Sequence, residues 1–195
     1  EEDLKKYPQR LKQLIIYGNE ILPLFNKSDL NKKDTFGNNA LHYAVMTKNS
    51  KPITYFNPTG LEALKKNDLG ANLWHFAFLP APKVLPKAYV DAELKVINKH
   101  LLENFKPSHI RFMTLGNPLN KEYPQTYPFE IFAYKFRHNN PELYTALKTK
   151  YPEIFMLSDE ELEENSLNTN EIEKVLNDLI IQIKDKIVVK GVKKR

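Results

Sequence analysis

The sequence predicts an all-α fold built from repeated helix-turn-helix units. Residues 34–44 read DTFGNNALHYA, and residues 67–77 read NDLGANLWHFA, with the glycines and the histidines each 33 positions apart. Apolar residues after each turn lie three apart, on one face of a short helix. One such unit cannot bury its apolar face alone, so several units must stack into a solenoid.

The two stretches resemble the ankyrin repeat, which is about 33 residues long and consists of a β-turn and two helices. Residues 41–44 (Leu-His-Tyr-Ala) and 74–77 (Trp-His-Phe-Ala) fit the Leu-His-x-Ala core of that repeat. Gly37 and Gly70 fall in the turns, where glycine adopts a positive φ without steric cost. The chain departs from the family at residues 39–40 and 72–73, where the family has Thr-Pro.

The resemblance implies an ankyrin-repeat domain at 1–152, made of about four degenerate repeats with short turn fingers and an irregular insertion. We expect the repeats at about 8–30, 31–66, 67–112 and 114–150. The first repeat acts as a cap, and residues 4–25 are expected to form a helix pair. A C-terminal helical cap at 153–189 and a basic tail at 190–195 follow.

Helices are expected at 40–48 and 73–79, and a long amphipathic helix at 87–104. Asn49 closes the first of these, because asparagine adopts the left-handed conformation readily. Pro52 suits the start of a second helix, and residues 57–60 (Asn-Pro-Thr-Gly) form a turn cluster. The prolines in residues 80–82 exclude a regular helix there, and Pro107 ends the long helix.

The fourth repeat is weaker. Residues 116–120 resemble the lead-in to a repeat, and residues 127–133 resemble its helix start, with Glu130 in the histidine position. A second helix is expected at 141–150, with Pro141 in its first turn.

The C-terminal part departs from the family. Capping-box patterns start at Ser158 and Asn170, and a helix is expected at 171–188. Its apolar stripe is expected to pack on the last repeat, and the alternative is that it docks a partner helix or a second copy. The stripe comprises Ile172, Val175, Leu176, Leu179, Ile183 and Ile187.

The histidines are the first candidates for chemistry. His42 and His75 occupy equivalent positions in adjacent units, roughly 10 Å apart, whereas metal ligands lie within about 2.1 Å of one ion. The resemblance implies that each bonds to the backbone of the neighbouring turn. His100, His109 and His138 are expected at the surface.

Nothing in the sequence indicates an enzyme. Cysteine is absent, which excludes disulfides and thiol catalysis, and no phosphate loop, zinc-protease or serine-hydrolase motif occurs. The acidic residues 159–164 are expected to form a solvated helix face. We therefore expect no catalytic residue, cofactor, metal or small-molecule substrate.

The resemblance implies a module that binds another protein in a concave groove. Phe36 and Leu69 are the expected apolar anchors at the turn tips, although Phe36 can equally pack on the neighbouring turn. The full set of expected protein-binding positions is Thr35, Phe36, Asn38, Met46, Thr47, Asp68, Leu69, Ala71, Leu79, Tyr123, Thr126 and Tyr134.

Two other functions stay open. Lys- and Asn-rich degenerate repeats are similar to effectors that bacteria deliver into host cells, and such repeats can target a catalytic domain elsewhere in a longer chain. The net charge of +5 is modest, so nucleic-acid binding is not favoured. The lack of cysteine and of an apolar run long enough to span a membrane favours a cytoplasmic protein or a secreted effector.

Overall fold

The computed structural model describes residues 26–83, 85–119, 121, 126–167, 171 and 173–178. Within these ranges the regular structure is helical, apart from an isolated antiparallel bridge between Leu115 and Tyr127. The predicted all-α class is therefore confirmed for this part of the chain. The elements are η2 (Lys27–Asn31), α2 (Ala40–Met46), α3 (Lys51–Phe56), α4 (Gly60–Ala63), α5 (Leu73–Phe78), α6 (Lys87–Glu103), η3 (Pro107–Phe112), α7 (Phe129–Lys135), η4 (Arg137–Asn139), α8 (Pro141–Lys150), η5 (Pro152–Ile154) and α9 (Asp159–Leu167).

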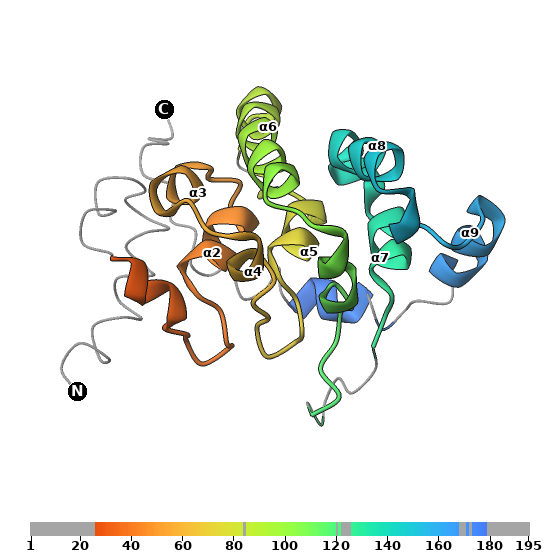
Figure 1. Cartoon of the computed structure of the whole chain (residues 1–195), viewed down its shortest axis with the longest axis horizontal. Helices are drawn as coiled ribbons and strands as arrows, with labels where there is room; N and C mark the ends of the chain where they lie inside the picture. Colours follow the sequence, from red (N-terminus) through yellow and green to blue (C-terminus); the bar gives the residue numbers. More distant parts are fainter. Residues whose placement is uncertain are drawn as a thin grey trace, which may run out of the picture.

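The helices form two rows. Figure 1 shows the short helices α2, α5 and α7 side by side, with α3, α6 and α8 above them. The contacts agree with this arrangement, since α5 packs between α2 and α7, α2 packs on α3, and α5 packs on α6. The loops before α2 and α5 project together from the lower edge of the molecule (Figure 1).

The two turns predicted from the repeat have the same hydrogen bonds. Asp34 Oδ1 accepts hydrogen bonds from the Phe36 and Asn38 amides at 2.9 and 3.0 Å. Asn67 Oδ1 accepts equivalent bonds, at 3.1 and 2.9 Å, from the amides two and four residues later. Gly37 and Gly70 have φ angles of +74° and +78°, so both need a conformation that glycine adopts without strain.

The helix starts repeat as well. Asn39 Oδ1 accepts from the His42 amide, while His42 Nδ1 accepts from the Asn39 amide, both at 3.0 Å. Asn72 and His75 form the same reciprocal pair, at 3.4 and 3.0 Å. The arrangement is a capping box in which histidine takes the place of the usual glutamate. Two consecutive units thus share one geometry 33 residues apart.

Lysines join each unit to the next loop. Lys33 Nζ donates to the Lys66 carbonyl at 2.8 Å, and Lys66 Nζ donates to the Thr114 carbonyl at 2.5 Å. The loop before α7 therefore stacks on the α5 loop as that loop stacks on the α2 loop.

Helix α2 ends differently from the prediction. The left-handed residue is Lys48, with φ +52°, and not Asn49. The Lys48 side chain is fully buried, and its Nζ donates to the Phe76 carbonyl at 2.9 Å and lies 3.5 Å from the Ala77 carbonyl. The Lys48 amino group thus satisfies carbonyl groups at the end of α5 that have no partner within the helix.

Residues between α7 and α8 complete the end of α5. The Pro80-Ala81-Pro82 segment follows α5 and is not helical, as predicted. The Ala77 carbonyl accepts from Asn140 Nδ2 at 3.1 Å, and the Phe78 carbonyl accepts from Asn139 Nδ2 at 3.0 Å. Side chains from the units on both sides therefore meet at the end of this one helix.

The remaining helices follow the predicted boundaries closely. The long helix is α6, which ends at Glu103, before Pro107 opens η3, and α8 has the expected bounds. Pro52 lies in the first turn of α3, and Asn57 ends that helix in a left-handed conformation. The capping box of Ser158 with Glu161 is present. The expected helix pair at 4–25, most of the first repeat and most of the expected helix at 171–188 lie outside the described residues.

Gly70 gives a test of how closely the loops stack. A Cβ atom at Gly70 would lie 2.0 Å from the Gly116 carbonyl oxygen and 2.2 Å from its carbon. We expect Gly70→Ala to lower the free energy of unfolding by at least about 2 kcal/mol, because left-handed strain and a backbone clash add. Urea unfolding measures the change.

Asn57→Ala is the matched control, because Asn57 is also left-handed, with φ +45°, but is exposed. We expect this change to cost about 1 kcal/mol, the strain alone. Equal losses in the two variants would show that the loops do not stack as described.

Candidate functional site

The turn tips form one continuous edge. Thr35, Phe36 and Asp68 are exposed, with 39% of the Phe36 surface accessible. The Asp68 amide donates to the Phe36 carbonyl at 3.1 Å, which joins the first tip to the second. Asn117 Nδ2 donates to the Asp68 carbonyl at 3.2 Å and extends the edge to the third loop.

A third loop residue adds apolar surface that the sequence analysis did not select. Leu119 is 91% exposed, two residues after Asn117. We call Thr35, Phe36, Asp68, Asn117 and Leu119 the tip row. Its last two members were missed because the repeat is degenerate here and its turn does not align with the first two.

Leu69 is not an exposed anchor, and this expectation is wrong. Only 7% of its surface is accessible. The third loop comes against this turn at Gly70, whose position leaves no room for a side chain beside Gly116. Leu69 is thus covered by the loop that follows it in the stack, whereas Phe36 of the first turn is exposed.

Two more turn positions are also interior. Asn38 and Ala71 are fully buried. Asn38 Oδ1 accepts from Asn67 Nδ2 at 3.0 Å, so Asn38 links the first turn to the second. These residues position the tip row without contributing surface to it.

The predicted helix positions are mostly part of the core. Met46 and Leu79 are each 1% exposed and belong to the main hydrophobic cluster. Thr47 is half-buried, and its hydroxyl donates to the Tyr43 carbonyl at 2.8 Å. Met46 and Leu79 therefore do not line a binding groove in this structure, because their apolar side chains fill the space between stacked units.

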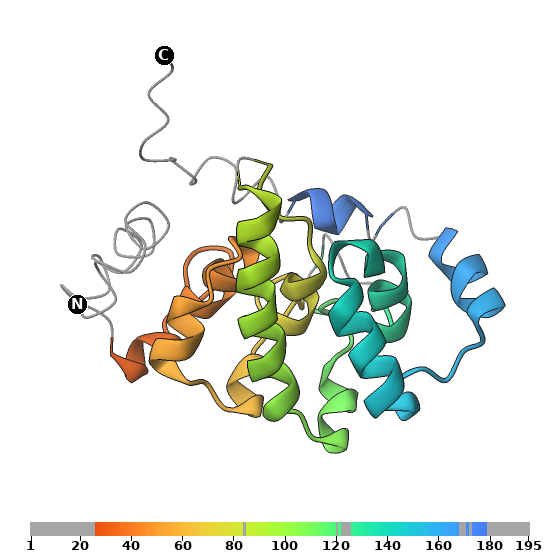
Figure 2. The same ribbon diagram turned by 90° about the horizontal axis from the view of Figure 1, so that it is seen from above.

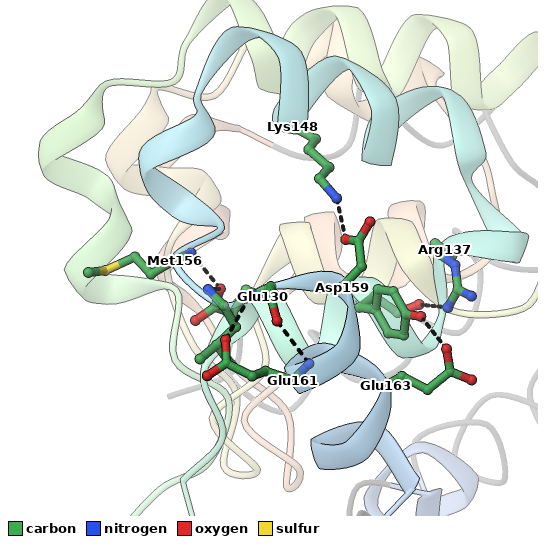
Figure 3. Close-up of polar contacts among 10 residues, drawn as sticks. Glu130, Arg137, Lys148, Met156, Asp159, Glu161 and Glu163 are labelled. Atoms are coloured by element: carbon green, nitrogen blue, oxygen red, sulfur yellow. Dashed lines mark hydrogen bonds and ion pairs between the residues drawn. The ribbon is translucent and has the colours of Figure 1, made fainter.

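The fourth repeat contributes one exposed position. Thr126 is exposed, and Tyr123 lies outside the described residues. Tyr134 is 8% exposed, and its hydroxyl donates to Glu163 of α9 at 3.1 Å (Figure 3). The chain's own C-terminal part therefore covers this predicted binding position.

Glu130 does not stand in the histidine position. Ile131 is the third residue of α7, as His42 and His75 are the third residues of α2 and α5. Ring contacts support this register, because His42 packs against Phe76 and His75 against Phe132, the fourth residues of the next helices, at 5.2 and 5.1 Å.

The Glu130 carboxylate has another partner. Its Oε2 accepts hydrogen bonds from the amides of Met156 and Leu157, at 2.8 and 3.1 Å (Figure 3). The contact fixes the path of the chain from α8 to α9, along the side of α7. Sequence reasoning missed this role because the two partners are 26 and 27 residues away.

The acidic residues of α9 are partly engaged. Asp159 pairs with Lys148 Nζ at 2.5 Å, and Glu161 Oε2 accepts from the Ser158 amide at 2.8 Å (Figure 3). The Asp159 pair attaches α9 to α8, and the Glu163 contact to Tyr134 attaches it to α7, whereas the Glu161 bond caps the start of α9 itself. All five acidic residues of α9 are exposed, as expected, and three of them also accept hydrogen bonds or form an ion pair.

The two equivalent histidines have structural roles. His42 is fully buried, and its Nε2 bonds to the Lys65 carbonyl at 2.8 Å, so the expected bond to the neighbouring turn is confirmed. His75 Nε2 faces the backbone of Met113, but no hydrogen bond of normal geometry satisfies it within the described part of the chain.

Burial sets the charge of both imidazoles. It lowers the pKa of His42 to about 4 and that of His75 to about 3, because the charged ring loses its hydration. Both rings are therefore neutral at pH 7, as their Nδ1 acceptor bonds require. Among the residues described, no three His, Asp or Glu side chains gather closely enough to hold a metal ion.

Two of the three histidines expected at the surface are not there. His109 is 5% exposed, and its Nδ1 accepts from the Lys106 amide at 3.2 Å. His100 is half-buried and bonds through Nε2 to the Pro58 carbonyl at 2.8 Å, while His138 is exposed. His109 caps the start of η3, and His100 joins the last turn of α6 to the turn before α4, a contact between residues 42 positions apart.

The chain matches no protein-family model, and neither a curated protein nor a solved structure matches it. Among the described helices we find none with the length and apolar character of a membrane span.

The buried histidines predict that acid destabilises the fold. Because their pKa values are lowered, the unfolded chain binds protons first as the pH falls below 6.5. Between about pH 7.5 and about pH 5 we expect the free energy of unfolding to fall by about 2 kcal/mol per histidine. Urea unfolding across this range measures it.

His42→Gln should be less stable than the parent at neutral pH but should lose less stability on acidification. His138→Gln is the control, since His138 is exposed, and its pH profile should follow that of the parent. Parallel profiles for His42→Gln and the parent would contradict the assignment of a neutral, buried His42.

Proposed function

We propose that this chain is a protein-protein interaction module of the ankyrin-repeat kind, which binds a partner protein through the tip row. The observation that carries the proposal is an exposed aromatic residue, Phe36, on a turn whose backbone is held by hydrogen bonds on both sides. Aromatic side chains are enriched among residues that dominate binding energy.

The rigidity of the tips supports the proposal. The turn carrying Phe36 is closed by the Asp34 carboxylate, and its carbonyl is bonded to the Asp68 amide of the next turn. A partner that binds such a preformed edge does not have to order it, which lowers the entropic cost of association.

The repeat geometry supports the ankyrin assignment. The same turn bonds, the same positive-φ glycine and the same Asn-His capping box recur 33 residues apart. The 33-residue period and the Leu-His-x-Ala pattern are those of the ankyrin repeat. The inferred mode of binding thus follows from both the repeat and its exposed edge.

Phe36→Ala tests the proposal. We expect this change to lower the affinity for a captured partner by about tenfold or more, because it removes the aromatic contact of the tip row. Stability should change little, since Phe36 is partly exposed. Partners would be captured from cell lysate at low and high salt, identified by mass spectrometry, and then measured by titration with the purified proteins.

Tyr89→Ala is the matched control. Tyr89 is 41% exposed, close to the value for Phe36, but lies on α6, in the other row of helices. Binding should survive this change. Loss of binding in Tyr89→Ala alone, or capture of nothing but nucleic acid that high salt removes, would overturn the proposal.

A further inference from the structure

The C-terminal part of the chain turns back across α7. In Figure 1, α6 and α8 lie above α5 and α7, and the helical residues 171 and 173–178, in blue, lie below them; Figure 2 shows the same blue segment from above. We call these seven residues the return segment. Val175 and Leu176 are 5% and 6% exposed and belong to the main hydrophobic cluster. The segment is therefore packed on the repeats and does not extend into solvent there.

Carboxylates of the return segment meet donors that belong to α7 and its lead-in. Glu173 pairs with Lys135 Nζ at 2.8 Å, and Glu171 Oε2 accepts from the Tyr127 hydroxyl at 2.6 Å. Lys135 Nζ also donates to the Ser166 carbonyl at the end of α9, at 3.1 Å. One lysine thus joins both α9 and the return segment to α7.

These contacts define what this face of α7 accepts. The face supplies an ammonium group from Lys135 and a hydroxyl from Tyr127, beside an apolar surface. The segment supplies two carboxylates followed by two apolar side chains. In a helix Glu171 and Val175 are four apart and lie on one face, and Glu173 and Leu176 are three apart. The occupant is therefore an acidic amphipathic helix.

The described contacts are of a kind that another helix can replace. The Glu173 side chain is 54% exposed although Lys135 is only 15% exposed, and the Tyr127–Glu171 bond is exposed to solvent. Polar pairs in contact with water add little to stability. The face keeps a contact that does not depend on the return segment, since Lys135 Nζ also donates to the Ser166 carbonyl of α9.

We propose that the return segment occupies, within the same chain, a docking face on α7, and that the partner which displaces it is an acidic amphipathic helix. Such a helix presents carboxylates where Glu171 and Glu173 lie and apolar side chains where Val175 and Leu176 lie. This inference rests on the proposed function, since it names the partner class and the intramolecular competitor for a second part of the binding surface.

A peptide with the sequence of residues 171–188 tests the inference as a labelled probe for binding to the full chain. The return segment competes with the probe, so the parent chain should bind it weakly. We expect Glu171→Gln/Glu173→Gln in the chain to raise the apparent affinity for the unmodified probe by about fivefold. Fluorescence anisotropy measures binding, and hydrogen exchange should show greater exchange at 173–178.

Glu160→Gln/Glu164→Gln is the control of equal charge change, on exposed positions of α9. It should leave probe binding at the parental value. A probe in which the residues equivalent to Glu171 and Glu173 are glutamine should bind the opened chain about fivefold more weakly than the unmodified probe. Equal probe binding by the parent and the opened chain, or no binding by either, would overturn the inference.

The variant Lys135→Met distinguishes release of the return segment from loss of the fold. The substitution removes the hydrogen-bond donor of the α7 face. Hydrogen exchange at 173–178 should therefore increase, and the variant should still bind the probe poorly. Tight probe binding by this variant would contradict the assignment of the face. Failure of the probe experiment together with Phe36-dependent capture of a partner would reject the intramolecular competitor and leave the proposed function intact.

Discussion

Reciprocal hydrogen bonds between a buried asparagine and a buried histidine hold the first helices of the two clearest units in place. Helices α2 and α5 have seven and six residues, too few to be stable in isolation. Asn39 with His42, and Asn72 with His75, satisfy backbone groups at their starts that would otherwise be buried without partners. The imidazoles must stay neutral for this, because Nδ1 can accept a hydrogen bond only without its proton.

Contacts between units depend on equally specific polar groups. At the end of α5, Lys48 from one neighbour and Asn139 and Asn140 from the other satisfy the last carbonyls of the helix. Burial lowers the pKa of Lys48 to about 7, because the charged amino group loses its hydration. Helix α5 is thus held by hydrogen bonds at both ends, and the turns that precede the helices are held in place with it.

Two surfaces of the molecule, the tip row and the face of α7, differ in their chemistry. The tip row carries the exposed residues Phe36 and Leu119, whereas the face of α7 is occupied by residues of the same chain. Six of the twelve positions expected to bind a partner are buried, between units or under α9. A partner of the proposed module would therefore meet a rigid edge directly, and a second face only after the return segment has left it.

Local patterns in the sequence determined the helix starts, the glycine turns and the bounds of α8, because these depend on hydrogen bonds among residues within five positions of one another. The bond of His42 to the neighbouring turn followed from the repeat. Only the tertiary structure decided that Leu69 is covered, that Lys48 and not Asn49 turns left-handed, and that Glu130 anchors the C-terminal chain. Each of these depends on a partner more than 25 residues away, whose position is set by how the units stack.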